Sequence, residues 1–291
     1  HGSAPASMSW CGEQSSAVPM IMLTRARSGS TVTCELLAKA TGSQPNLLWT
    51  EPFEPFFGFK AEPHNASSIL ALAKQLLCPG DSWTPRLSSQ RHLVGFKWKP
   101  YWHDLLEFDR LLDWVAKHEI PVVFLTRNIL DVALHEMKHL FVPGYTACQE
   151  RRATSDCTQL RRAATMQVNP SLLSERLTQL SFEDHTMHRK LGHLHVRYTN
   201  ASYESLFGIT EAGAASDTPD ILHLRRKDVW RRLLDFLGFQ SAQPPPIAAA
   251  TISQSSEHAS GQLGAVRNAD EVRHVLTRTG FGSLLRPPPL R

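Results

Sequence analysis

Two stretches of the chain place basic and hydroxyl side chains directly after a short apolar run. Residues 27–31 (Arg-Ser-Gly-Ser-Thr) follow the apolar residues 18–23, and Arg127 and Asn128 follow the apolar residues 121–126. A strand that leads into a helix through small residues lets backbone amides approach an anion. Both stretches therefore predict phosphate-binding turns, although each can also be an ordinary capped turn between a strand and a helix.

The first of these turns carries several groups that favour an anion. Arg27 supplies a positive charge, and Gly29, which has no side chain, lets the backbone approach the anion closely. Hydroxyl donors come from Ser28, Ser30 and Thr31. The pattern G-x-x-x-x-G-K-[ST] of nucleotide triphosphatases is absent from the chain. The turn therefore predicts a phosphate site of a different kind.

The second turn runs into a motif that can bind metal. Residues 135–139 (His-Glu-Met-Lys-His) match H-E-x-x-H, which on a helix presents two zinc ligands on one face with a glutamate as base. A catalytic zinc needs a third ligand, and the extended motif fails because Val142 stands where its glycine belongs. Glu150 and Glu175 are further ligands without a supporting pattern. We expect no metal: Glu136 and His139 then lie on a solvated face of the helix, and His135 can contact a phosphate.

Alternating apolar runs and amphipathic segments predict the elements that position these residues. Strands are expected over 18–23, 46–50, 92–98, 121–126 and 193–198. Helices are expected over 32–41, 67–77, 102–118, 129–141, 171–191, 226–238 and 268–276. Strands that alternate with helices predict an α/β fold with a central parallel sheet flanked by helices.

Length and composition indicate an ordinary globular protein. The 291 residues are 42% hydrophobic and 20% charged, which is enough to bury a normal core. We expect one domain over 18–285 with a mobile loop over 240–261. A flexible arm over 1–17 precedes it, and a Pro-rich tail over 286–291 follows it.

Charge and cysteine content narrow the class of partner and the compartment. A net charge of +4 suits an anionic ligand but is too small to indicate nucleic acid. No apolar run reaches the roughly 18 residues of a membrane span, and because the chain starts at His1 we expect any signal or membrane anchor upstream of it. Five cysteines indicate no disulfide framework, although Cys148 and Cys157 could pair. Glycosylation sequons at Asn65 and Asn200 slightly favour the secretory route.

The first turn resembles the 5′-phosphosulfate loop of sulfotransferases that use 3′-phosphoadenosine 5′-phosphosulfate (PAPS). The resemblance implies that Arg27 stabilises the bridging oxygen as sulfate leaves, and that the residues after it hold the 5′-phosphate, namely Ser28, Gly29, Ser30 and Thr31. It also implies a three-layer P-loop-like α/β fold.

The second turn resembles the R-N-x-x-D corner of the same family, with Arg127, Asn128 and Asp131 in register. In that family the arginine and a serine eight residues later bind the 3′-phosphate. The eighth residue here is His135, whose ring N–H can donate in place of the serine hydroxyl.

Other stretches extend the resemblance over roughly 18–285. Residues 94–100 resemble the central strand, which implies that Lys97 faces the sulfate. Residues 193–200 resemble a strand that ends in a tyrosine near the nucleotide, which implies a cofactor contact for Tyr198, although Thr199 replaces the glutamate that usually follows. The segments 233–239 and 266–285 resemble the closing helices.

Sulfuryl transfer also needs a base for the acceptor hydroxyl. The small-molecule branch of the family uses a histidine two residues after the central-strand lysine, where this chain has Lys99, a poor base. The carbohydrate branches use a glutamate, and residues 49–56 offer Glu51 and Glu54. We predict that Glu51 is the base, ahead of Glu54 and then His103, with Arg27 and Lys97 neutralising the developing charge.

These observations predict a sulfotransferase that moves a sulfuryl group from PAPS to a hydroxyl, with a carbohydrate as acceptor. The expected partners are the nucleotide donor and a glycan, without nucleic acid and with a membrane only through an upstream anchor. The Golgi lumen is favoured over the cytoplasm. Two alternatives stay open: a zinc metallohydrolase built on residues 135–139, and a non-catalytic nucleotide- or glycan-binding relative.

Overall fold

The computed structural model describes most of the chain, and the structural statements below concern these stretches alone: residues 17–25, 28–44, 51, 66–78, 91–99, 105–142, 145, 165–207, 219–246 and 262–285. Several predictions lie outside them, namely the strand over 46–50, the arm over 1–16, the tail over 286–291, residues 247–261 of the predicted loop, Glu54, His103 and the Cys148–Cys157 pair. None of the helices in these stretches combines the length and apolar character that crossing a bilayer requires.

The chain divides into two compact units, which are described separately. The sheet unit comprises residues 1–126, 188–201 and 230–245, and the α4 unit comprises residues 127–187, 202–229 and 246–291. The single domain expected over 18–285 stays a prediction.

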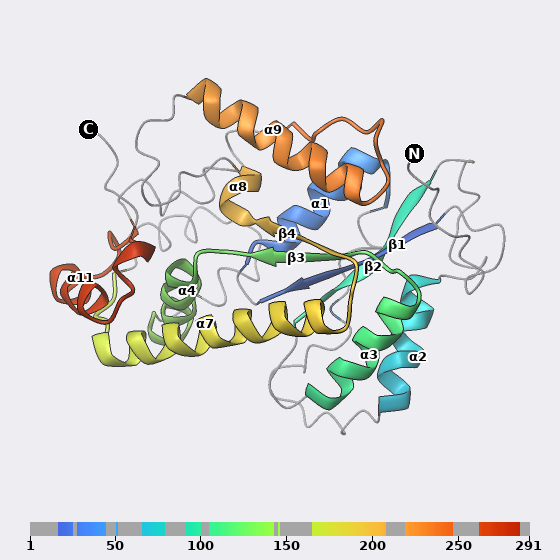
Figure 1. Cartoon of the computed structure of the whole chain (residues 1–291). Helices are drawn as coiled ribbons and strands as arrows, with labels where there is room; N and C mark the ends of the chain where they lie inside the picture. Colours follow the sequence, from blue (N-terminus) through green and yellow to red (C-terminus); the bar gives the residue numbers. More distant parts are fainter. Residues whose placement is uncertain are drawn as a thin grey trace. The chain divides into compact units, whose positions relative to one another are not determined.

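Four strands form the sheet, as Figure 1 shows: β1 (Ala17–Thr24), β2 (His92–Trp98), β3 (Val122–Thr126) and β4 (Tyr198–Ser202). Their order is β2-β1-β3-β4, and the sheet is parallel throughout. The prediction of an α/β fold with a central parallel sheet and flanking helices is therefore confirmed. Because the strands are parallel, the ends of β1, β2 and β3 lie at one edge of the sheet.

The strands of this sheet are apolar because both of its faces are covered. Every residue of β2 and nearly every residue of β1 is buried, as expected where helices pack on each side of a parallel sheet. Met20 lies opposite Gly95 and Met22 lies opposite Lys97 in the register between the two strands. Lys97 is therefore one residue from the end of β2, at the edge where the first predicted turn leaves β1.

Helices of the sheet unit lie on both sides of the strands. Figure 1 shows α1 (Ser30–Thr41) on one side, with α2 (Ala66–Leu77) and α3 (Leu105–Lys117) together on the other. Gly42 ends α1 in a left-handed conformation with φ 66°, which is common where a glycine follows a helix. Cys78, directly after α2, is disulfide-bonded.

Helices α4 (Ile129–Phe141) and α11 (Ala269–Arg278) belong to the α4 unit together with α8 (Tyr203–Phe207) and the 3-10 helix η4 (Gly282–Leu284). Two longer helices, α7 (Pro170–His193) and α9 (Pro219–Phe236), begin in this unit. The core of the unit forms where apolar residues of α4, α7 and α11 meet. The sequence predicted the longer helices but neither α8 nor η4.

The strand predicted over 193–198 was placed five residues too early, because β4 begins at Tyr198. The chain there closes α7: Val196 donates its backbone N–H to the Leu191 carbonyl at 3.0 Å, and His195 takes a left-handed conformation with φ 53°. Strand β4 begins at Tyr198 instead, and the Arg197 carbonyl accepts a hydrogen bond from Val122. Tyr198 therefore starts the strand that it was expected to end.

Candidate functional site

The turn after β1 depends on a glycine. Gly29 has φ 83°, a left-handed conformation that glycine adopts without steric cost, and it is the N-cap of α1. The Gly29 carbonyl accepts hydrogen bonds from the Thr33 backbone N–H and from the Thr33 hydroxyl, both at 3.1 Å. Helix α1 then begins at Ser30, and its first backbone amides have no partner within the helix.

Hydroxyl groups tie this turn to the end of the neighbouring strand. Thr24 Oγ1 is hydrogen-bonded to Ser28 Oγ and lies 3.3 Å from the Leu125 carbonyl oxygen. Ser28 and Ser30 are both buried. The ends of β1 and β3 therefore fix the shape of the turn from inside, while Arg27 lies outside the described residues.

Three of the predicted site residues meet beside this turn. The Lys97 Nζ donates to Thr31 Oγ1 at 3.1 Å and lies 2.5 Å from Glu51 Oε1. The other carboxylate oxygen, Glu51 Oε2, lies 2.5 Å from the Lys99 Nζ. The Lys97 side chain is only 5% exposed, and those of Lys99 and Glu51 are 13% and 19% exposed. The contact between Lys99 and Glu51 was not predicted from the sequence, where Lys99 was considered only as a possible base.

The charges of this cluster suit an anion. Two ammonium groups face one carboxylate, which leaves one positive charge in a mostly buried place where Coulomb interactions are stronger than in water. Cys34 lies in the same neighbourhood but is no nucleophile. Burial raises the pKa of its thiol from 9.0 to about 12, and the positive charge of Lys97 offsets this only in part.

The second turn lies at the start of the α4 unit, and hydrogen bonds of Asn128 fix its conformation. Its side-chain oxygen accepts from the Leu130 backbone N–H at 3.0 Å, which makes Asn128 the N-cap of α4. The Asn128 backbone N–H donates to Glu204 Oε1 at 3.1 Å, and Asn128 Nδ2 donates to the Leu284 carbonyl at 3.0 Å. Asn128 therefore holds α4, α8 and η4 together.

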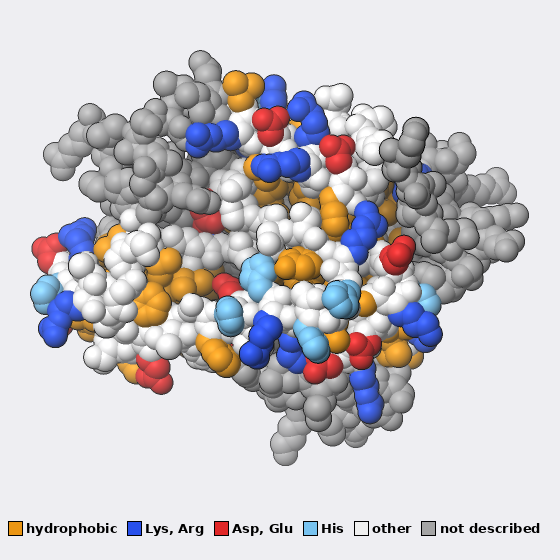
Figure 2. Space-filling model, viewed as in Figure 1, with side chains coloured by type: hydrophobic (Ala, Val, Ile, Leu, Met, Phe, Trp, Pro, Cys, Tyr) orange, Lys and Arg blue, Asp and Glu red, His pale blue; other side chains and the backbone are white. Residues whose placement is uncertain are grey.

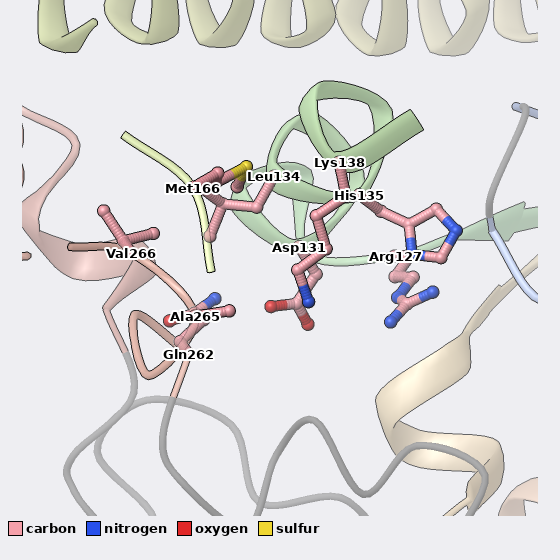
Figure 3. Close-up of a pocket in the computed structure, with 9 residues that line it drawn as sticks. All are labelled: Arg127, Asp131, Leu134, His135, Lys138, Met166, Gln262, Ala265 and Val266. Atoms are coloured by element: carbon pink, nitrogen blue, oxygen red, sulfur yellow. The ribbon is translucent and has the colours of Figure 1, made fainter. Parts of the chain in front are cut away.

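A pocket opens beside this turn, with Arg127 and His135 both in its wall (Figure 3). The Arg127 guanidinium lies over the Tyr203 ring, 4.8 Å from its centroid. On α4 the pocket is also lined by Asp131 and Lys138, both buried. The facing wall comes from two segments joined by a parallel bridge between Met166 and Val266. The pocket thus contains the two predicted phosphate ligands, Arg127 and His135, together with Asp131 of the predicted corner and Lys138, which was given no role.

A wider hollow in the same unit has a different character. It has a volume of about 410 Å³, and hydrophobic side chains gather there, beside α11 in Figure 2. Phe141 and Leu172 line it and are 60% and 51% exposed. Its only charged lining residue among those described is Glu271. An anion therefore suits the pocket beside Arg127 better than this hollow.

The glutamate of the H-E-x-x-H motif is engaged by an arginine. Arg176 Nε and Nη2 donate to the two oxygens of Glu136 at 2.8 and 2.9 Å. This hydrogen bonding raises the pKa of the Arg176 guanidinium, with burial opposing it. The His135 and His139 rings lie 5.1 Å apart. Within the described stretches, no three His, Cys, Asp or Glu side chains are grouped so that they could hold a metal ion.

The start of β4 places Tyr198 away from the first turn. Because Arg197 pairs with Val122 at the start of β3, Tyr198 lies at the opposite edge of the sheet from the end of β1. Tyr203 and Glu204 follow β4 directly. These residues contact Arg127 and Asn128, respectively. A strand boundary placed five residues later would have found them in the sequence.

No protein-family model matches the chain, and no curated protein resembles it significantly.

Proposed function

We propose that this protein is a sulfotransferase that uses PAPS, with a three-layer P-loop-like α/β fold and a hydroxyl on a carbohydrate as acceptor. The observation that carries the proposal is the contact of Lys97 with both Thr31 and Glu51. This contact brings together three groups: the turn that carries Thr31 and suits a phosphate, the buried cation of Lys97, and the carboxylate of Glu51. They meet at the edge of the sheet where the strands end, which is where α/β proteins bind ligands.

The first turn is assigned to the 5′-phosphosulfate. The backbone amides at the start of α1 and the hydroxyls of Ser30 and Thr31 hold the phosphate. Lys97 supports charge on the sulfuryl group, and Arg27 neutralises the oxygen that leaves. The left-handed Gly29 supports this assignment, because a side chain there would strain the turn.

The second turn is assigned to the 3′-phosphate. Arg127 offers a planar pair of N–H donors, which suits phosphate oxygens. His135 lines the same pocket and can donate from its ring. The stacking of Arg127 on Tyr203 supports the proposal, since it holds the guanidinium in one orientation before a ligand binds.

Glu51 is assigned to the acceptor. Its carboxylate takes the proton of the acceptor hydroxyl while the acceptor oxygen forms a bond to sulfur. The bond from sulfur to the 5′-phosphate oxygen breaks, and its electron pair leaves with 3′-phosphoadenosine 5′-phosphate (PAP). Both oxygens of Glu51 face lysine ammonium groups, those of Lys97 and Lys99.

Location in the Golgi lumen is part of the proposal. The disulfide at Cys78 supports it, because disulfides persist in oxidising compartments and are rare in the cytosol. The carbohydrate acceptor rests on the glutamate base, which the carbohydrate branches of the family use.

Calorimetric titration of metal-free protein with PAP tests the proposal. We expect tight binding by the wild-type protein and a loss of roughly 10- to 100-fold in affinity for Arg127→Ala, because the removed guanidinium makes charged hydrogen bonds to phosphate. Arg110→Ala, which removes an exposed arginine of α3, is the control and should bind as the wild type does.

Transfer from labelled PAPS to a panel of glycans completes the test. Transfer establishes the activity, whereas binding of PAP without transfer to any glycan would favour the non-catalytic relative. Absence of PAP binding, together with zinc in the protein as purified, would favour the metallohydrolase and contradict the proposal.

A further inference from the structure

Lys138 lies in the pocket beside Arg127 and His135, although the resemblance gives it no role. Asp131, His135 and Lys138 are spaced by four and three residues on α4, which places them on one face of the helix. All three line the pocket, as Figure 3 shows. Lys138 is only 5% exposed.

The charged end of Lys138 lies over one aromatic ring, that of Tyr145. The Lys138 Nζ lies 6.0 Å from the centre of the Tyr145 ring, and Tyr145 is only 1% exposed. The His135 and His139 rings pack edge-on against the same tyrosine at 5.7 and 5.1 Å. Lys138 and His135 therefore share one aromatic support, which orders both before a ligand arrives.

The balance of charge in the pocket favours an anion. Arg127 and Lys138 are positive and Asp131 is negative, so these three residues leave one positive charge, and His135 adds another when protonated. The pocket has a volume of about 30 Å³, far below the roughly 300 Å³ of a site for a whole small molecule. It therefore suits one anionic group of a larger ligand rather than a nucleoside.

We infer that Lys138 is a further ligand of the phosphate monoester held by Arg127 and His135, and that it adds selectivity for a nucleotide with a 3′-phosphate. This inference rests on the proposed function. A lysine ammonium carries three donors on a flexible stem, so it can reach oxygens that the planar fork of Arg127 leaves without a donor.

The test compares two nucleotides that differ by the 3′-phosphate alone, PAP and adenosine 5′-phosphate (AMP). Wild-type protein and Lys138→Met are titrated with each nucleotide by calorimetry. We expect the variant to lose roughly 10- to 100-fold in affinity for PAP and less than about twofold for AMP, because the loss is confined to one charged contact. Lys117→Met removes an exposed lysine of α3 and serves as the control for total charge.

The possible results distinguish a failure of the role of Lys138 from a failure of the proposed function. Equal losses for PAP and AMP, or no loss for either, would overturn the role of Lys138 while leaving the proposed function in place. A wild-type protein that binds neither nucleotide would overturn both. If Lys138→Met shows no cooperative unfolding transition, Lys138→Gln replaces it, because glutamine removes the charge but keeps a polar end in the pocket. The same selective loss of PAP affinity is expected.

Discussion

Lys97 and Glu51 form a largely buried ion pair, with the Lys97 Nζ 2.5 Å from Glu51 Oε1. The pair is asymmetric, because the other oxygen of Glu51 contacts Lys99 while Lys97 also donates to Thr31. A ligand anion can therefore attract Lys97 without leaving the carboxylate alone, since Lys99 still holds it. The arrangement keeps a cation and a carboxylate side by side.

The replacement Glu51→Gln separates binding from transfer. We expect sulfuryl transfer to fall by at least about 100-fold, because an amide cannot accept the acceptor proton. Affinity for PAP should stay equal or rise, since the change removes a negative charge beside Lys97 and Lys99. Initial rates with labelled PAPS and calorimetry with PAP measure the two effects.

Asp113→Asn, which changes an exposed carboxylate of α3, is the matched control for loss of one negative charge. It should leave both transfer and binding unchanged. Full activity in Glu51→Gln would move the base to another residue, with Glu54 the first to examine.

Most of the sheet could be predicted from the sequence because three of its four strands are runs of apolar residues. The stretches that became β1, β2 and β3 are buried on both faces, so their composition alone distinguishes them from the amphipathic helices. The polar strand β4 (Tyr-Thr-Asn-Ala-Ser) has no such signal and forms because it pairs with β3. The apolar residues before it, including Val196, belong instead to the turn that ends α7.

The candidate site was predictable to the extent that its residues stand next to strands. Thr31, Lys97 and Arg127 lie at or just beyond strand ends, where parallel sheets bind ligands. Lys99 and Lys138 could not be predicted, because an isolated lysine in a sequence indicates a solvated surface. Their burial comes from Glu51 and from Tyr145, which contact them through the fold and not through the sequence.

Cys34 should resist thiol reagents in the folded protein. Its side chain is buried on α1, with the Sγ 3.6 Å from the Met22 sulfur, and burial raises its pKa to about 12. Because the thiolate is the reactive form, alkylation at mildly alkaline pH should miss Cys34 until denaturant exposes it. Peptide mapping by mass spectrometry measures the modified fraction, and rapid labelling of the native protein would contradict this account.

The same thiol should make stability depend on alkaline pH. The folded pKa of Cys34 lies above its usual 9.0, so the folded state keeps this proton longer than the unfolded state. The contribution to stability is complete below pH 9.0 and is lost as the pH rises toward about 12, by at most about 1.4 kcal/mol per pH unit. Urea unfolding at several pH values should show a smaller fall for Cys34→Ala than for the wild type.

Gly95 and Gly192 form a matched pair for testing how the sheet positions Lys97. A Cβ at Gly95 would clash with the Met20 carbonyl on the neighbouring strand, whereas a Cβ at Gly192 would meet nothing within 4 Å. We expect Gly95→Ala to lose at least about 2 kcal/mol of unfolding free energy. Gly192→Ala, in the last turn of α7, should be neutral or gain up to about 1 kcal/mol. Urea unfolding followed by circular dichroism measures both.

The clash at Gly95 also reaches the candidate site. Gly95 and Lys97 are two residues apart on β2, so they point to the same face, and Met20 and Met22 are their partners on β1. Any shift of β2 that relieves the clash moves Lys97 relative to the turn that β1 carries. Folded Gly95→Ala protein should therefore bind PAP more weakly than Gly192→Ala protein does. Equal affinities would show that the β1–β2 register is not what holds Lys97 against Thr31.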